Sequence, residues 1–320
     1  MSESGTPTRF SVVVPVYNNE GSIPALIERL ASMNLDLGGE LEAVFVVDGS
    51  PDRSFPALKE RLASAGFRSQ LVALSRNFGS FPAIRRGLTI AQGPYFAVMA
   101  ADLQEPSEVI FEFFRRLATD EVDVMIGERT GRSDPVLTSL SSRGFWWAYR
   151  RFVQPEVPAG GVDVFGCNLV VRDALLSLRE SNSTLIGLLF WLGFRREYVP
   201  YQRQAREHGA SGWSFRRKYR YLLDSAFSFT DLPIEILATV GGVGVLVSVL
   251  LSAVVLIMRL TGRIPVLGYT PIILLLLFST SMILLALGIV GSYVWRTYEN
   301  SKNRPLYVPL SHETFQGDDG

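Results

Sequence analysis

The sequence predicts an α/β domain with a mostly parallel sheet, followed by a hairpin of two transmembrane helices. Three observations lead to this prediction. In the first third of the chain, apolar β-branched runs alternate with segments of helical periodicity. A polar cluster follows each of four such runs, and the last third holds two long stretches without a charged residue.

The alternating runs define the expected elements of the domain. Strands are expected at residues 10–16, 41–47, 71–74 and 95–99, with helices at residues 23–33, 55–65, 81–91 and 107–118. This order favours right-handed βαβ units around a parallel sheet. The predicted organisation is a tail (1–9), the α/β domain (10–205), a lid with a juxtamembrane amphipathic helix (206–232), a first membrane helix (233–260), an external loop (261–268), a second membrane helix (269–296) and a cytoplasmic tail (297–320).

The two uncharged stretches are long enough to cross a bilayer. Residues 236–258 carry no charge and form about 34 Å of helix at 1.5 Å per residue, against a hydrocarbon core of about 30 Å. Residues 264–295 are also uncharged and longer. The alternative, that one of them is a buried helix of a soluble protein, is disfavoured by their length.

Basic residues flank the two stretches unevenly. Before the first come Arg216, Arg217, Lys218 and Arg220, after the second come Arg296, Lys302 and Arg304, and between them lie Arg259 and Arg263. The positive-inside rule then places the α/β domain and both termini in the cytoplasm. Gly244, Ser248 and Ser252 recur every four residues, which leaves homo-oligomerisation through a small-residue face open.

Composition excludes several classes of protein. With 31 basic and 31 acidic residues the net charge is zero, so nucleic acid is not an expected partner. The single cysteine, Cys167, excludes an intramolecular disulfide and is expected in the core. Two histidines disfavour a zinc site. Residues 1–9 lack the pattern of a cleaved signal, and the tail from Ser311, rich in polar residues, is expected to be disordered.

Polar clusters follow the four expected strands. They are Tyr17–Glu20 (YNNE), Asp48–Ser50 (DGS), Ser75–Asn77 (SRN) and Asp102–Gln104 (DLQ). Ligands of parallel α/β sheets bind beyond the carboxyl ends of the strands. The four clusters therefore predict one binding site.

Five segments carry a family resemblance. SVVVPVYNNEGSI, VVDGSPDRS, LSRNFGSFPAIRRGL and VMAADLQEP, in this order, resemble family 2 glycosyltransferases of the GT-A (Rossmann-like) fold. REHGASGWSFRRKYRYLLDSAFSFTDLP, followed by the two stretches, is similar to the branch that makes polyisoprenyl-phosphate sugars, such as dolichol-phosphate mannose synthase and bacterial polyprenyl-phosphate glucosyltransferases. The resemblance covers residues 10–305.

The resemblance implies a nucleotide-sugar donor with Mg²⁺ or Mn²⁺ on its diphosphate, held by Asp102 and Gln104. On alternate residues after a strand, these two side chains can point the same way. The alternative is an ordinary strand-to-helix turn in which Asp102 caps the next helix. Two departures stand out, because relatives carry aspartate at the positions of Ala100 and Val47. Altered donor choice, weaker metal dependence and inactivity are all open consequences.

The resemblance also assigns the remaining site. The nucleotide-sugar residues are Pro15, Tyr17, Glu20, Asp48 and Asp102; the lipid-phosphate residues are Arg129, Arg143 and Arg206; the catalytic residues are Asp163 and Asp102. Arginine suits phosphate because its planar fork makes paired, charge-assisted hydrogen bonds, although Arg129 or Arg143 taken alone is more readily a solvated surface residue. The role of Arg76 and Asn77 stays open. Arg206 and residues 211–220 are expected to form a lid at headgroup depth.

The resemblance implies an inverting transfer of a sugar, with UDP-hexose favoured as donor, to a polyprenyl phosphate at a bacterial inner membrane. A lipid phosphate is already largely dianionic at neutral pH and needs little help from a base. Asp163 is then better suited to orientation or electrostatic stabilisation than to general-base catalysis. Two rivals are a processive polysaccharide synthase, for which a QxxRW-type segment is missing, and a non-catalytic membrane scaffold that binds a flippase or another transferase.

Overall fold

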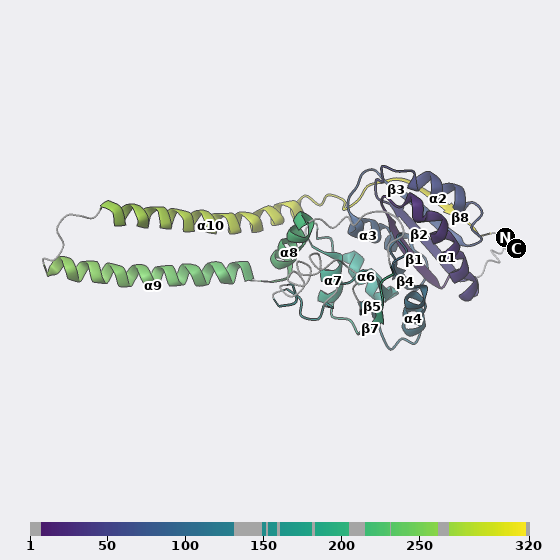
Figure 1. The fold of residues 1–320 in the computed structure, drawn as a ribbon, viewed down its shortest axis with the longest axis horizontal. Helices are drawn as coiled ribbons and strands as arrows, with labels where there is room; N and C mark the ends of the chain where they lie inside the picture. The colour runs from purple at the N-terminus through teal and green to yellow at the C-terminus, as the bar shows by residue number, and fades with distance from the viewer. Residues whose placement is uncertain are drawn as a thin grey trace.

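The computed structural model describes residues 8–130, 149–151, 153–158, 161–180, 183–204, 215–230, 232–261 and 269–317. An eight-stranded sheet with helices on both faces forms one end of the molecule, and two long helices project from the other (Figure 1). The predicted α/β domain with a mostly parallel sheet is confirmed.

The first four strands and helices lie close to the predicted positions. They are β1 (Phe10–Val16), α1 (Ile23–Asp36), β2 (Leu41–Val47), α2 (Ser54–Leu62), β3 (Arg68–Leu74), α3 (Ser80–Ile90), β4 (Tyr95–Val98) and α4 (Ser107–Leu117), with a short 3-10 helix, η1 (Glu20–Ser22), before α1. These four strands are parallel to one another in the order β4-β1-β2-β3. The repeated βαβ pattern therefore sets the central part of the sheet.

The second half of the sheet was not predicted. Its elements are β5 (Val124–Arg129), β6 (Phe165–Asn168), α6 (Leu169–Ser177), α7 (Leu185–Trp191) and β7 (Arg196–Tyr201). The short strand β6 joins β4 and β5 in antiparallel fashion, and β7 is parallel to β5, which gives the full order β7-β5-β6-β4-β1-β2-β3-β8.

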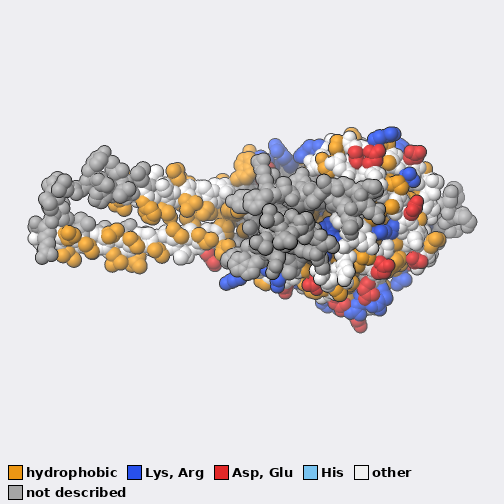
Figure 2. Space-filling view, viewed as in Figure 1, with side chains coloured by type: hydrophobic (Ala, Val, Ile, Leu, Met, Phe, Trp, Pro, Cys, Tyr) orange, Lys and Arg blue, Asp and Glu red, His pale blue; other side chains and the backbone are white. Residues whose placement is uncertain are grey.

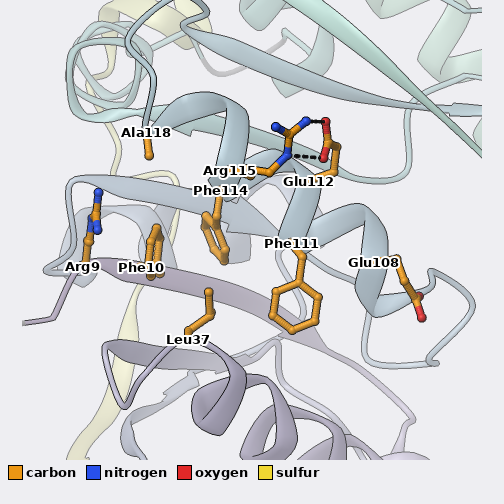
Figure 3. Close-up of a pocket in the computed structure, with 9 residues that line it drawn as sticks. All are labelled: Arg9, Phe10, Leu37, Glu108, Phe111, Glu112, Phe114, Arg115 and Ala118. Carbon is orange, nitrogen blue, oxygen red and sulfur yellow. Dashed lines mark hydrogen bonds and ion pairs between the residues drawn. The ribbon is translucent and has the colours of Figure 1, made fainter.

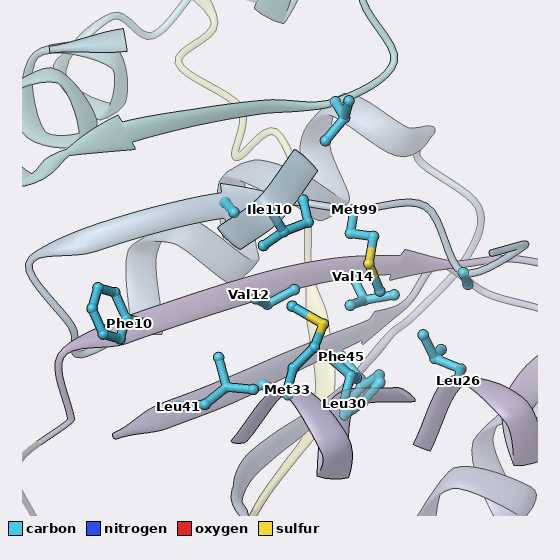
Figure 4. Packing of buried hydrophobic residues seen from close by; sticks show 14 of the residues in the cluster. Phe10, Val12, Val14, Leu26, Leu30, Met33, Leu41, Phe45, Met99 and Ile110 are labelled. Atoms are coloured by element: carbon cyan, nitrogen blue, oxygen red, sulfur yellow. The ribbon is translucent and has the colours of Figure 1, made fainter. Parts of the chain in front are cut away.

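Side chains that alternate along the strands fill two cores, one on each face of the sheet. Val12 and Val14 pack with Leu30 of α1 and Ile110 of α4 on one face (Figure 4), whereas Val13 packs on the other face with residues of α3, α6 and α7. This is the period of two expected for strands buried on both faces. Cys167 is buried in the second core, as predicted.

Three helices follow the sheet domain: α8 (Phe215–Phe229), α9 (Leu232–Leu260) and α10 (Tyr269–Ser301). Helices α9 and α10 run side by side away from the domain, and their apolar side chains are exposed (Figure 2). Among the described residues, 278–301 form a helix long and apolar enough to cross a membrane; a second candidate arises only if residues 223–229 and 232–244, which meet at 83°, count as one span.

The predicted disorder of the tail from Ser311 is wrong. Residues Pro309–Phe315 form β8, which pairs antiparallel with β3 at the edge of the sheet. His312 Nε2 lies 2.7 Å from Gln70 Oε1, and Lys59 Nζ lies 2.7 Å from a carboxylate oxygen of Glu313. The strand carries mostly polar residues because it covers an edge whose backbone groups would otherwise lack partners.

The course of β8 also orients the sheet. The chain leaves α10 at the end of the domain from which α9 and α10 project, and its C-terminus lies at the opposite end (Figure 1). The backbone N–H of Ser75, just after β3, donates to the carbonyl of Val308, just before β8, at 2.9 Å. Because β3 is antiparallel to β8, the carboxyl ends of β3 and of its parallel neighbours face α9 and α10.

Removal of β8 tests its structural role. We expect deletion of residues 309–320 to lower the free energy of unfolding by about 2–4 kcal/mol and to promote aggregation, because each lost backbone hydrogen bond contributes about 1 kcal/mol net and the β3 edge becomes exposed. Thermal unfolding and light scattering in detergent measure both effects. Deletion of residues 316–320 alone is the control, and equal midpoints for the two deletions would contradict the assignment.

Candidate active site

The loops after β1 and β2 are joined by hydrogen bonds at the carboxyl end of the sheet. The backbone N–H of Asn18 donates to Ser50 Oγ at 2.8 Å, and that of Glu20 donates to Asp52 Oδ2 at 3.0 Å. Burial would raise the pKa of Asp52, but hydrogen bonds from Ser50, Ser54 and the Glu20 amide lower it. The predicted nucleotide loop is therefore held in place by Asp52, a residue that the sequence analysis missed.

The predicted nucleotide residues differ in their exposure. Tyr17 is 42% exposed, and Pro15 is partly exposed in β1, beyond the last residue that pairs with β4. Glu20 instead accepts a hydrogen bond from the backbone N–H of Arg53 at 3.1 Å, next to the first turn of α2. The Tyr17 ring is thus accessible to a planar base, whereas Glu20 holds the two loops together.

Asp48 lies at the end of β2 and is 2% exposed. Its two carboxylate oxygens accept hydrogen bonds from the backbone N–H groups of Phe78 and Gly79, each at 2.7 Å. Burial raises its pKa, an effect that these two bonds and the charge of Arg76 oppose. Asp48 therefore holds the loop after β3 against the end of β2, and any nucleotide contact must be shared with this role.

Arg76 and Gly49 complete this junction. The Arg76 guanidinium lies 4.0 Å from the centre of the Phe78 ring. Gly49 has φ of 58°, and a Cβ there would come within 2.3 Å of the Arg76 carbonyl carbon. Only glycine permits both this backbone conformation and this close approach of the two loops.

The predicted metal ligands lie in a turn after β4 rather than on an extended strand. Between Asp102 and Gln104, Leu103 has φ of 60°, which is rare for a bulky residue and typical of functional sites. Arg29 of α1 holds the turn by donating to the carbonyl of Glu105 at 2.9 Å. The expected strand-like alternation is thus replaced by a left-handed residue that sets the directions of Asp102 and Gln104.

Gln104 is anchored to the segment after β7. The side-chain Nε2 of Gln104 donates to the backbone carbonyl of Gln204 at 3.1 Å, and the backbone carbonyl of Gln104 accepts from the backbone N–H of Gln204 at 2.9 Å. The side-chain oxygen of Gln104, Oε1, therefore faces away from the Gln204 carbonyl oxygen. Oxygen donors of this type suit Mg²⁺ or Mn²⁺.

Within the described ranges, no three His, Cys, Asp or Glu residues are grouped closely enough to hold a metal by themselves. Mg²⁺ is commonly bound by one or two carboxylates together with substrate phosphates and water. Asp102, which is half-buried, and Gln104 fit such a shared site. They fit a cation that binds together with a diphosphate better than one resident in the protein alone.

Glu105 is fully buried beside this turn and was not predicted as a site residue. In the part of the chain that the structure describes, neither of its carboxylate oxygens has a hydrogen-bond partner. Burial raises its pKa to about 8, with further contributions from the negative charges of Asp102 and Asp163. The charges of those two predicted catalytic carboxylates therefore both act on Glu105.

The predicted acceptor residues are partly described. Arg129, at the end of β5, forms an ion pair with Asp163 in which the two side chains are 11% and 28% exposed. Burial would lower the pKa of the Arg129 guanidinium, but the charge of Asp163 and contact with Tyr201 raise it. Arg143 and Arg206 lie outside the described residues. The structure thus pairs Arg129 with Asp163, and the charges of Asp163 and Asp102 both act on Glu105.

A shallow pocket of about 520 Å³ lies elsewhere, between the start of β1, the end of α1 and α4 (Figure 3). Phe10, Leu37 and Phe111 line it, beside an ion pair between Arg115 and Glu112. It lies at the amino-terminal end of the strands. Since the polar loops and the charged cluster lie at the carboxyl end, this pocket is not part of the candidate active site.

The raised pKa of Glu105 predicts a pH-dependent stability. Between its ordinary pKa of 4.5 and about 8, the folded protein holds a proton that the unfolded chain releases. The stabilisation is complete below pH 4.5 and is lost as the pH rises through 8, by up to about 1.4 kcal/mol per pH unit. In detergent and chelator, we expect the unfolding midpoint to fall from pH 5.5 to 8, and Glu105→Gln to flatten this slope.

Glu112→Gln is the matched control for that measurement. Glu112 is paired with Arg115, whose hydrogen bond lowers the carboxyl pKa, so it does not titrate in this range. Parallel stability curves for the wild type and Glu105→Gln would show that Glu105 is charged throughout.

Comparisons with known proteins identify the family of the chain. The family described as Glycosyl transferase family 2 matches residues 11–177. A putative glycosyltransferase of Bacillus subtilis, CsbB, is 32% identical over 298 residues, which cover 93% of this chain and 90% of that protein. The bactoprenol glucosyl transferase of Shigella phage SfV is 29% identical over 301 residues, covering 94% of this chain and 97% of that protein.

Among solved structures, glucosyl-3-phosphoglycerate synthase from Mycobacterium tuberculosis in complex with UDP is similar with a TM-score of 0.49 and 22% identity, covering 69% of this chain and 80% of that chain. A likeness of this size says nothing of substrate. The family match spans more than half of the chain, from β1 to the end of α6. The chain therefore belongs to glycosyl transferase family 2 and is a glycosyltransferase.

Proposed function

We propose that the protein transfers a hexose from a UDP-sugar to the phosphate of a polyprenyl lipid at a membrane, with inversion at the anomeric carbon. The observation that carries this proposal is the orientation of the sheet. Its carboxyl end, with Asp102, Asp163 and Arg129, faces the apolar helices α9 and α10. A soluble donor and a lipid acceptor can meet in such a site.

The relatives support the lipid acceptor. The bactoprenol glucosyl transferase of Shigella phage SfV matches this chain over nearly its whole length, including the region of α8, α9 and α10. We infer that α9 and α10 both span the membrane as a hairpin, with the sheet domain and both termini in the cytoplasm. The basic residues that flank the hairpin support this orientation.

The residues of the cluster divide the reaction between them. Arg129 binds and orients the acceptor phosphate, whose oxygen attacks C1 of the sugar while the bond from C1 to the UDP oxygen breaks. Asp163 stabilises the positive character that develops at C1. Asp102 and Gln104 would hold Mg²⁺ or Mn²⁺, which would neutralise the charge gathered on the departing diphosphate. No general base is required because the attacking phosphate is already ionised.

Family membership and relatives named as glycosyltransferases favour this enzyme over a non-catalytic scaffold. The two unusual positions bear on donor choice instead. Val47 is buried in the core, so its side chain offers nothing to a nucleotide, and Ala100 is partly exposed. Nucleotide contacts on the β2 side must then come from other groups, such as the backbone of the loops that Asp48 and Asp52 hold.

Transfer by the purified protein tests the proposal. In detergent, we expect it to move label from UDP-hexose, within a panel of nucleotide sugars, to undecaprenyl phosphate, and chelation to stop the reaction. Asp102→Asn should lower kcat by about 100-fold or more, as for other groups that stabilise developing charge. Asp173→Asn, an exposed carboxylate on α6, is the control. Binding of UDP without any lipid-linked product across the panel would refute the proposal.

Arg129→Lys tests the acceptor site separately. Lysine keeps the charge but loses the planar fork, so we expect the KM for the lipid phosphate to rise about tenfold or more, the equivalent of about 1.4 kcal/mol. The dissociation constant for UDP should not change. Arg115→Lys, in an exposed ion pair, is the control. An unchanged acceptor KM would remove Arg129 from the phosphate site.

A further inference from the structure

A tyrosine hydroxyl lies against the ion pair of the candidate active site. Tyr201, the last residue of β7, is 5% exposed, and its hydroxyl donates to Asp163 Oδ2 at 3.4 Å. The same oxygen of Asp163 accepts from Arg129. Asp163 therefore has two partners, one charged and one neutral.

The position of the Tyr201 ring is fixed from two sides. The backbone carbonyl of Tyr201 accepts two hydrogen bonds from Thr130, one from the backbone N–H at 2.9 Å and one from the side-chain Oγ1 at 3.1 Å. On β5, a Cβ at Gly127 would come within 3.1 Å of Tyr201 Cε1 and 2.3 Å of Val164 Cγ1. The missing side chain at Gly127 thus provides the space in which the ring reaches Asp163.

The Tyr201 hydroxyl keeps its proton and is therefore a hydrogen-bond donor. Burial raises its pKa well above the ordinary value, and the negative charges of Asp163 and Glu105 raise it further. At any pH at which the protein works, Tyr201 can donate to a carboxylate. At 3.4 Å the bond is long, but hydrogen bonds at catalytic groups commonly shorten once substrate is bound.

In the proposed reaction, Arg129 interacts with two anions, the carboxylate of Asp163 and the acceptor phosphate. In the structure it is paired with Asp163, yet the acceptor phosphate requires the same guanidinium. When Arg129 turns toward the phosphate, Asp163 loses part of its support just as C1 develops positive charge. We propose that Tyr201 is a positioning residue of the transfer site, whose hydroxyl holds the Asp163 carboxylate while Arg129 is shared with the acceptor phosphate.

This inference rests on the proposed function, and its test removes one oxygen atom. Tyr201→Phe should lower kcat by about 10- to 100-fold, in the range of misplaced catalytic groups, while the KM values for UDP-hexose and undecaprenyl phosphate change by less than about threefold. The matched control is Tyr198→Phe on the same strand, where the hydroxyl donates to the backbone carbonyl of Glu156 at 3.0 Å. It should keep the wild-type kcat.

A second measurement separates positioning from a structural role. If Tyr201 acts through Asp163, then Tyr201→Phe introduced into Asp163→Asn should lower the residual kcat by less than about twofold, because the interaction is already lost. Thermal midpoints of Tyr201→Phe and Tyr198→Phe, measured in detergent, should lie close to that of the wild type.

The outcomes are distinct. A wild-type kcat in Tyr201→Phe, or a full additional loss in the Asp163→Asn background, would overturn the inference while leaving the proposed function intact. A wild-type protein that makes no lipid-linked product would instead overturn the proposed function. A fall in kcat confined to Tyr201→Phe and absent on top of Asp163→Asn supports both.

Discussion

The antiparallel pairing of β8 with β3 is the constraint on which the arrangement of the site depends. The strand begins where the chain leaves α10 and ends at the far side of the domain, so it connects the long helices directly to the sheet. Because the central strands are parallel to β3, this one pairing fixes the direction in which all their carboxyl ends point. A site built on those ends therefore faces the helices.

The charges of the site explain why it is suited to a substrate that brings a cation. The negative charges of Asp102 and Asp163 both act on the buried Glu105, the positive charge of Arg203 opposes them there, and Arg129 is paired with Asp163. Buried charges of one sign are costly unless they are paired or neutralised. The raised pKa of Glu105 is one response, since the group keeps its proton instead of adding a charge. A divalent cation is a second, and it would lower the cost of the remaining carboxylates.

The sequence predicted the centre of the fold well, because four buried parallel strands leave an apolar signal that needs no tertiary context. It did not predict β8, whose polar residues leave no such signal and whose partner Gln70 lies 242 residues away from His312. The sequence also missed Tyr201, whose partner Asp163 is distant along the chain, and it did not show that Glu105 is completely buried. Residue spacing reveals neither feature. Val47 shows the converse, because motif comparison marked the position without showing that the side chain is in the core.

A series of side-chain contacts connects helix α10, through α8 and α7, to the strand that ends in Tyr201. Arg296 of α10 is paired with Asp224 of α8 at 2.7 Å, so this charge, counted among the basic flank of the hairpin, also fixes α8 against α10. Phe229 of α8 lies so close to α7 that a Cβ at Gly187 would come within 2.4 Å of its ring. Phe190 of α7 in turn lies 4.9 Å from the Arg196 guanidinium, at the start of the strand that ends in Tyr201. Close-packed interiors deform little, so in the proposed membrane-bound enzyme this succession of contacts would set the height of Asp163 above the lipid surface. A transfer between a soluble donor and a lipid phosphate depends on that height, because the attacking oxygen must come within about 3–3.5 Å of the reacting carbon.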